Sequence, residues 1–366
     1  MSRGTPNRDP DAAPRREEGL PPLSLPERIE DVEQLEDLLS WPTPEVVDTM
    51  GRLEGDLLVL GVGGKIGPSL ARMARRASDL AGVPRRIVGV ARFSSPDLRS
   101  NLHAYGIETI ACDLLDRAAL NALPDMPNVL YLAAMKFGST GQEAATWAMN
   151  CYLPGMVCEK YHASRIVAYS TGNVYAMSPP ASGGPDENGT LGPVGDYAMS
   201  CLGRERIFSH FSRVLGIPVA LLRLNYAHEM RYGVMVDLAQ QILAGRAIDL
   251  TMGHFNAIWQ GDTNAMTLRA LDHAASPPRV VNLAGLDVLC VRRVAERLGE
   301  LLDKPVAFSG SEAPDALLSN GRLGQELLGH PQVTVDQMLA WIADWQLRGG
   351  ATLGKPTHFQ TRDGKF

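Results

Sequence analysis

Glycines between residues 61 and 67 have the spacing of a phosphate-binding turn. The stretch Gly61-Val-Gly-Gly64-Lys-Ile-Gly67 directly follows a short apolar run and precedes a helical pattern. Glycines at a strand-to-helix turn let the backbone approach a pyrophosphate closely, and the first turn of the helix attracts its negative charge. An ordinary glycine-rich turn is the alternative, but the surrounding strand–helix–strand unit favours dinucleotide binding. The residues that we expect to contact the dinucleotide here are Gly61, Gly63, Gly64, Lys65, Ile66 and Gly67.

Residues after the next two predicted strands bear on which dinucleotide binds. Arg92 ends the second strand where an acidic residue commonly binds ribose hydroxyls, and a guanidinium there can pair with a 2′-phosphate. NADP is therefore favoured over NAD, unless Arg92 is a solvated surface side chain. Asp113 can accept a hydrogen bond from the adenine amino group beside Leu114, or cap a helix that begins at Leu114. Lys65 can place a positive charge near the phosphates or face water.

These residues need a sheet that gathers strand ends, and the chain from residue 56 to residue 224 predicts one. Short apolar runs alternate with helical patterns, which is typical of right-handed βαβ crossovers and a parallel sheet covered on both faces. We therefore predict an α/β fold, a Rossmann-type doubly wound parallel sheet with a smaller C-terminal substrate lobe. The predicted strands are 57–61, 86–91, 107–112, 129–134, 165–170 and 219–224, and the longest predicted helices are 146–162 and 197–215.

The same patterns divide the chain into five segments. Residues 1–26, rich in Pro, Arg and acidic residues, are predicted to be a disordered tail. Residues 27–52 hold two helical patterns that extend the minimal fold, and the sequence does not indicate their role. The dinucleotide-binding domain covers residues 53–226, and the smaller substrate-binding lobe, interleaved with it, covers residues 227–348. Residues 349–366 are predicted to be an extended tail that can reach a partner subunit.

Composition narrows the classes of function. The 366 residues carry a net charge of −6 and no block of Lys or Arg, so the clustered basic face of a nucleic-acid-binding protein is missing. Apolar runs are too short to cross a membrane, and the first twenty residues lack the apolar segment of a signal peptide. Five cysteines without a CxxC pair and scattered histidines favour reduced thiols and no metal site. We expect a cytoplasmic protein that binds a small molecule, not a nucleic acid or a membrane.

Motifs further along the chain resemble a known family. Ser170-Thr171-Gly-Asn-Val174-Tyr175 follows the fifth predicted strand, and Tyr197 lies 26 positions after Thr171 near the start of a helix. Leu132-Ala133-Ala134, Asn150 and Arg223-Leu-Asn225-Tyr226 follow the same order as the motifs of that family. Over residues 56–346 the sequence resembles the extended short-chain dehydrogenases/reductases, the NAD-dependent epimerase/dehydratase family. The resemblance adds Ala133, Ala134 and Tyr197 to the residues expected at the cofactor.

The resemblance implies acid–base catalysis at a substrate oxygen. In this family hydride moves between the nicotinamide and a carbinol or carbonyl carbon, a Tyr transfers the proton, and a Ser or Thr hydrogen-bonds the same oxygen. These roles fall on Tyr197 and Thr171. A phenol ordinarily has a pKa of about 10, and the family lowers it with a Lys four residues after the Tyr. Here Cys201 occupies that position, and a neutral thiol cannot replace an ammonium.

Three explanations of this departure remain open from the sequence. Lys136, just after the fourth strand, can supply the missing charge, although a solvated loop lysine is an equal alternative. The chemistry can instead be altered, with Tyr197 as a weak or merely binding residue. The protein can also be a catalytically silent nicotinamide-dinucleotide-binding regulator or scaffold, although the presence of both Thr171 and Tyr197 argues for an enzyme.

The region after Tyr226 departs from the family as well. Ala227-His228-Glu229-Met230-Arg231 stands where the family usually has a Gly-Pro turn, which argues against a standard nucleotide-diphosphate sugar. With Asn225, the side chains of His228 and Arg231 are candidates for binding a polar substrate. Trp259 can line the substrate pocket or lie in the core. Asp262 is expected to cap the helix that follows it.

The resemblance implies an NAD(P)-dependent oxidoreductase, ketoreductase or epimerase/dehydratase that acts on a sugar-like hydroxyl or keto substrate. Two family helices equivalent to 146–162 and 197–215 often pair across a dimer axis, so a homodimer is expected. The apolar residues of these helices can equally pack on the sheet. They are Met149, Leu153, Met156, Leu202, Ile207 and Phe211.

Overall fold

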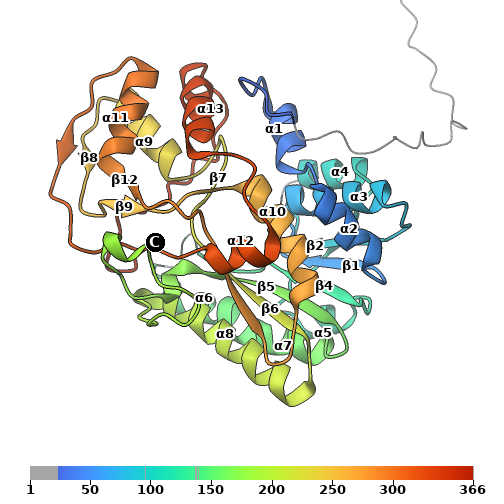
Figure 1. The fold of residues 1–366 in the computed structure, drawn as a ribbon. Helices are drawn as coiled ribbons and strands as arrows, with labels where there is room; N and C mark the ends of the chain where they lie inside the picture. Colours follow the sequence, from blue (N-terminus) through green and yellow to red (C-terminus); the bar gives the residue numbers. More distant parts are fainter. Residues whose placement is uncertain (1–23, 95, 137, 139, 366) are drawn as a thin grey trace, which may run out of the picture.

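A seven-stranded parallel sheet forms the centre of the protein, as a computed structural model describes it for residues 24–94, 96–136, 138 and 140–365 (Figure 1). The strands are β1 (Leu57–Leu60), β2 (Ile87–Ala91), β3 (Glu108–Ala111), β4 (Asn128–Tyr131), β5 (Arg165–Thr171), β6 (Val219–Leu224) and β11 (Arg279–Leu283). They lie in the order β11-β6-β5-β4-β1-β2-β3, and all neighbouring pairs are parallel. The predicted α/β fold with a Rossmann-type doubly wound sheet is confirmed.

The strand order reverses beside β1, and this reversal places the candidate site. β1 pairs with β2 on one side and with β4 on the other. In doubly wound sheets such a switch point opens a crevice at the carboxyl ends of the strands, where ligands bind. The glycine turn follows β1, Lys136 follows β4, and Thr171 ends β5. All three therefore belong to the same edge of the sheet.

Both faces of the sheet are buried. Leu57 and Val59 belong to one apolar core, while Leu58 and Leu60 belong to another, as the two-residue period of a strand requires. Helices from both halves of the chain cover the first face, and helices from the middle of the chain cover the second. On the first face lie α2 (Pro44–Arg52), α3 (Gly67–Leu80), α4 (Pro96–Ala104) and α10 (Gln260–Arg269), and on the second α5 (Arg117–Asn121), α7 (Leu153–Lys160) and α8 (Gly195–Leu215).

The smaller lobe has an apolar core of its own, and the N-terminal extension contributes to it. Leu35 and Leu39 of α1 (Val32–Leu39) belong to this core together with three helices from the C-terminal part of the chain. α2, in contrast, packs on α3 and α10 and adds to the core of the sheet, so the extension joins both cores. The elements of this lobe are α9 (Val234–Leu243), α11 (Val291–Leu302), α13 (Val335–Leu347), and the paired short strands β7 (Ala227–His228) with β10 (Ile258–Trp259), β8 (Ile248–Asp249) with β13 (Phe308–Ser309), and β9 (His254–Phe255) with β12 (Leu289–Cys290). α12 (Arg322–Leu328) lies between the last two of these helices in sequence but packs on β11 of the sheet.

Two local predictions need correction. The helix predicted for 146–162 is α6 (Glu143–Trp147), a π-helical turn (Ala148–Tyr152) and α7, because Pro154 at the start of α7 has no N–H for a continuous ladder. Asp262 does not cap a helix, since α10 already begins at Gln260. Its carboxylate accepts hydrogen bonds from the backbone of Gln332 (2.9 Å) and Val333 (3.3 Å). No helix in the described part of the chain has both the length and the apolarity to cross a bilayer.

Candidate active site

The glycine turn requires glycine at two of its positions. Gly61 has a φ of +86°, and a Cβ there would lie 2.7 Å from the backbone nitrogen of Ala133 at the end of the neighbouring strand. A Cβ on Gly67 would collide with the backbone of Val62, so its absence lets α3 start close to the strand. Among the described residues no side chain caps the first turn of α3. Backbone N–H groups at a helix start, without side chains that block or cap them, can bind a pyrophosphate.

Two further cofactor candidates lie at the ends of β2 and β3. Arg92 is exposed and lines a cavity of about 480 Å³ together with residues of α4. Asp113 is exposed and Leu114 is buried. The Asp113 carboxylate accepts a hydrogen bond from Leu115 N (3.1 Å), whereas the helix that follows is capped by Asp116. The helix-cap alternative for Asp113 is therefore wrong, because the helix begins later than the sequence pattern indicated.

Lys65 does not face water freely, and a place near the phosphates remains a prediction. Its ammonium donates to the carbonyl of Ala227 (2.8 Å) and lies 4.1 Å from the centre of the Tyr232 ring. Burial lowers the pKa of Lys65 to about 7, and the Glu229 carboxylate opposes this fall. The side chain thus ties the glycine turn to the loop that enters the smaller lobe.

Thr171 and Tyr197 meet where β5 ends and α8 begins. Thr171 is the last residue of β5, and Tyr197 lies in the first turn of α8. Both are buried, and the phenol shares a hydrogen bond with the Thr171 side chain. Burial raises the pKa of Tyr197 well above its usual range, and neighbouring Cys201 adds to the rise. The Arg204 guanidinium and the hydrogen bond to Thr171 oppose it.

Lys136 comes to the same place from the end of β4. Its ammonium lies 5.8 Å from the centre of the Tyr197 ring, and burial lowers its pKa to about 8. The preceding residue is fixed by Asn150 in the π-helical turn. Asn150 accepts from Met135 N (2.9 Å) and donates to Met135 O (3.0 Å). We refer to Lys136, Thr171, Tyr197 and Cys201, which include the predicted candidates for catalysis, as the catalytic corner.

Cys201 is fully buried in the corner, and a cation that the sequence analysis missed lies one turn further along α8. Arg204 is 2% exposed and donates to the Asn150 carboxamide oxygen (2.8 Å) and to Tyr169 O (2.8 Å). Burial raises the pKa of the Cys201 thiol, and Arg204 opposes the rise. An arginine seven residues after Tyr197 lies on the same side of a helix, and this spacing was the available signal.

The four predicted substrate-binding residues have different surroundings. Asn225 is buried and lies beside Gly172, the residue that follows Thr171 in the chain. His228 shares a hydrogen bond with Tyr226 O (2.7 Å), and burial lowers its pKa to about 3, so its ring is neutral at pH 7. Trp259 is 2% exposed and packs on Trp341, as the core alternative requires.

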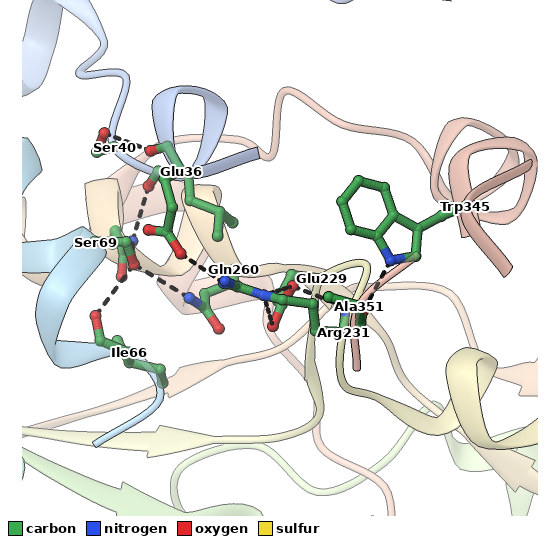
Figure 2. A network of polar contacts seen from close by, with 11 residues as sticks. Glu36, Ser40, Ile66, Ser69, Glu229, Arg231, Gln260, Trp345 and Ala351 are labelled. Carbon is green, nitrogen blue, oxygen red and sulfur yellow. Dashed lines mark hydrogen bonds and ion pairs between the residues drawn. The ribbon is translucent and has the colours of Figure 1, made fainter. Parts of the chain in front are cut away.

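Arg231, the fourth, takes part in ion pairs within the chain. Its guanidinium pairs with Glu229 (3.0 Å) and with Glu36 of α1 (2.7 Å), as Figure 2 shows. Its charge is therefore already balanced by two carboxylates. Through this contact α1 of the N-terminal extension holds the loop to which Lys65 is bound.

The C-terminal segment packs on its own chain and ends beside the corner. Thr357 donates to the Asp237 carboxylate through its backbone N (2.8 Å) and its hydroxyl (2.6 Å). Phe359 is buried against Phe255. A Cβ on Gly195, which starts α8, would lie 2.5 Å from the carbonyl oxygen of Gly364. The segment thus extends from the smaller lobe to the helix that carries Tyr197.

Comparison with known proteins agrees with this architecture. Residues 57–284 match the model of the NAD dependent epimerase/dehydratase family. UDP-glucuronic acid 4-epimerase from Bacillus cereus, in complex with NAD, is similar over 79% of this chain and 98% of its own, with 19% identity and a TM-score of 0.66. dTDP-glucose 4,6-dehydratase from Bacillus anthracis, in complex with NAD, is similar over 81% of this chain and 97% of its own, with 15% identity and a TM-score of 0.67. UDP-glucose 4-epimerase from Thermotoga maritima, with UDP-glucose, is similar over 80% of this chain and 99% of its own, with 18% identity and a TM-score of 0.65. Comparison with curated proteins gives no match.

Proposed function

Because the chain belongs to the NAD dependent epimerase/dehydratase family, we propose that it is an enzyme that transfers hydride at a hydroxyl or keto carbon of a sugar-like substrate. The observation that carries the proposal is the meeting of Thr171, Tyr197 and Lys136 at the edge of the sheet that also bears the glycine turn. Net oxidoreduction, epimerisation and dehydration each require proton transfer at a substrate oxygen, so these groups do not separate the three reactions.

The dinucleotide supplies the hydride acceptor or donor when it is bound. The backbone of the glycine turn and the start of α3 would hold its phosphates, and Arg92 favours NADP(H) over NAD. Thr171 hydrogen-bonds the substrate oxygen, and Tyr197 donates or accepts its proton. A phenol with a raised pKa stays protonated at neutral pH and so cannot accept a proton, and a nearby positive charge is needed to favour the phenolate. The Lys136 ammonium supplies it in place of the lysine that Cys201 replaces.

A sugar-like substrate is supported by the similar structures, which include enzymes with UDP-glucuronic acid and UDP-glucose. In this chain, however, Arg231 is paired with two carboxylates and is not free to bind a phosphate or carboxylate. Asn225, which lies beside Gly172, remains the predicted substrate-binding residue nearest to Thr171. We therefore propose recognition of hydroxyl groups rather than of a charged group at this loop.

The second candidate is a silent dinucleotide-binding regulator, and one observation favours it. The pKa of Tyr197 is raised, and a buried thiol, whose own pKa is also raised, stands where the family has its ammonium. If Lys136 does not act on the phenol, Tyr197 stays protonated and the corner only binds. The two candidates differ in whether Lys136 and Tyr197 affect turnover.

A homodimer remains part of the proposal. α7 and α8 contact each other, since a Cβ on Gly155 would lie 3.7 Å from Ile207 and 3.6 Å from Phe211. Leu153 and Met156 are buried in the sheet core, as the alternative to a dimer face requires. Tyr152 and Met199 are 55% and 48% exposed and offer apolar surface for a partner. Light scattering that shows a monomer at micromolar concentration would reject the dimer.

The test of function is turnover of UDP-glucose, UDP-glucuronic acid and free sugars with NAD or NADP, followed by NMR of the products and absorbance of the reduced nicotinamide. We expect Tyr197→Phe and Lys136→Met to lower kcat about 10²-fold or more while dinucleotide binding is kept. Lys160→Met, which alters an ion pair with exposed Asp125, is the matched control and should act like the parent. Parental turnover in both corner variants would contradict the proposal. Binding without turnover of any substrate by the parent would favour the regulator.

A further inference from the structure

A basic cavity lies beside the glycine turn, between the end of β2 and α4. Its volume is about 480 Å³. Arg92 comes directly after β2, and Arg99 and His103 come from successive turns of α4. The lining residues contain no Asp or Glu within the described part of the chain, and they are Arg92, Phe93, Arg99, Ser100, His103 and Ala111.

Two of the basic side chains share an anchor on β3. The Nε of Arg99 donates to the hydroxyl of Thr109 (3.0 Å), and the His103 Nε2 lies 2.6 Å from the same oxygen. This bond uses the Nε of Arg99, one of the five N–H donors of a guanidinium, and Arg99 itself lines the cavity. Both residues are therefore held at the cavity by the sheet, rather than extended freely into water.

The cavity is joined to the glycine turn by direct packing. A Cβ on Gly63 would lie 3.2 Å from the Ala91 Cβ and 3.6 Å from the Leu98 Cδ2. The middle of the turn thus rests on the end of β2 and on α4, the two elements that form the cavity. Phe93 turns the chain between them with a left-handed φ of +49°, which a residue with a Cβ adopts only at some expense in energy.

Chemistry decides which group of a dinucleotide such a cavity accepts. A ribose 2′-hydroxyl is commonly bound by a carboxylate, whereas a 2′-phosphate is a doubly charged acceptor that guanidinium groups bind by charge-assisted hydrogen bonds. Two guanidiniums, an imidazole and a hydroxyl form the donor set here. We propose that this cavity is a 2′-phosphate subsite in which Arg99 and His103 act with Arg92 to select NADP(H) over NAD. The inference rests on the proposed function, because it places the rest of the dinucleotide at the glycine turn.

The experiment is calorimetric titration of the full chain with NADP⁺, NAD⁺, 2′,5′-ADP and 5′-AMP. The last two probes differ only in the 2′-phosphate. The variants are Arg92→Ala and Arg99→Ala, with Arg86→Ala as the matched control. Arg86 precedes the opposite end of β2, where it pairs with Glu108 on the surface. Circular dichroism verifies that each variant is folded.

We expect the parent to bind NADP⁺ at least about tenfold more tightly than NAD⁺. Each cavity variant should weaken NADP⁺ and 2′,5′-ADP about tenfold to a hundredfold while NAD⁺ and 5′-AMP change less than about twofold. Arg86→Ala should behave like the parent. NAD⁺ binding that equals or exceeds NADP⁺ binding, or variants without effect on 2′,5′-ADP, would overturn the subsite and the preference for NADP(H), and would leave the proposed hydride transfer intact. Failure to bind either dinucleotide would overturn both.

Discussion

The glycine turn and the catalytic corner lie at the same edge of the sheet but are built in opposite ways. The turn is seven consecutive residues, and it acts through backbone that approaches closely at Gly61 and Gly67. The corner is gathered from the ends of β4 and β5 and from the first turns of α8. Thr171, Tyr197 and Cys201 are buried, Lys136 is half-buried, and their protonation depends on charges from distant parts of the chain. We therefore expect the turn to be disrupted by substitutions that add a side chain to its glycines, and the corner by substitutions that remove a charge.

The corner also depends on a buried ion pair beneath it. Arg223 and Glu205 are joined at 2.7 Å with both side chains about 95% buried, and the Ser170 hydroxyl donates to the same carboxylate (2.5 Å). Ser170 directly precedes Thr171. Ions taken out of water destabilise a fold unless they are paired, so the end of β5 is held by an interaction that is costly to break.

The largest effect that we expect comes from breaking this pair. Arg223→Met leaves the Glu205 charge buried without its partner, which should lower the free energy of unfolding by about 3–5 kcal/mol. Denaturant unfolding measures it. Arg86→Met, in an exposed pair with Glu108, is the control and should change stability far less, because exposed ion pairs contribute little. If both variants lose the same amount, the corner does not rest on the buried pair. The double variant Arg223→Met/Glu205→Met should recover part of the loss.

The glycine turn gives the second effect. In Gly61→Ala a methyl group would lie 2.7 Å from Ala133 N at a φ of +86°, so we expect a loss of about 1–3 kcal/mol together with weakened dinucleotide binding. Gly82→Ala is the control, because Gly82 has a φ of +69° but no described atom within 4 Å of the added Cβ. Thermal unfolding and dinucleotide titration check both. Unchanged binding in Gly61→Ala would show that the turn is not the phosphate site.

The same contrast explains what could be predicted from the sequence. The strands, the sheet and the glycine turn follow from patterns within a few residues, and the α/β fold was predicted correctly. Thr171 and Tyr197 were named because a family resemblance supplied their order, and Lys136 because it follows the fourth predicted strand. The structure brings the three together. Their roles remain proposals.

Pairings between distant residues could not be predicted. Three such contacts join residues that lie far apart in the sequence, so no helix or strand periodicity indicates them. They are Lys65 with Ala227, Glu36 with Arg231, and Thr357 with Asp237. Arg204 had a local signal, but its burial depends on Asn150 in a π-helical turn that Pro154 imposes. The sequence thus predicts helices and strands well, and it predicts the polar and ionic contacts between them poorly.

The pH dependence of activity sharpens the proposed role of Lys136. Its pKa is about 8, so the ammonium predominates below pH 8 and is lost above it, whereas an ordinary lysine stays charged to about pH 10.4. We expect kcat/KM to fall as pH rises through 8, to about a tenth one pH unit higher. Lys136→Arg keeps its charge across this range, so its alkaline limb should disappear or move to higher pH. Identical limbs in parent and variant would remove Lys136 from the mechanism.

The smallest effect concerns Asp237, the link between the C-terminal segment and the corner. Its carboxylate raises the pKa of Lys136, against the larger lowering by burial. Asp237→Asn removes this charge, so the pKa of Lys136 should fall below 8. The alkaline limb should then move to lower pH by less than about one unit. The asparagine carbonyl can still accept both hydrogen bonds from Thr357, so the segment should stay in place.

Thr357→Val is the converse variant, because it removes the hydrogen bond of the Thr357 hydroxyl (2.6 Å) and keeps the Asp237 charge. It should cost about 1 kcal/mol of stability and leave the limb unmoved. A limb that moves in Thr357→Val but not in Asp237→Asn would show that the segment acts on the corner through its position and not through the carboxylate.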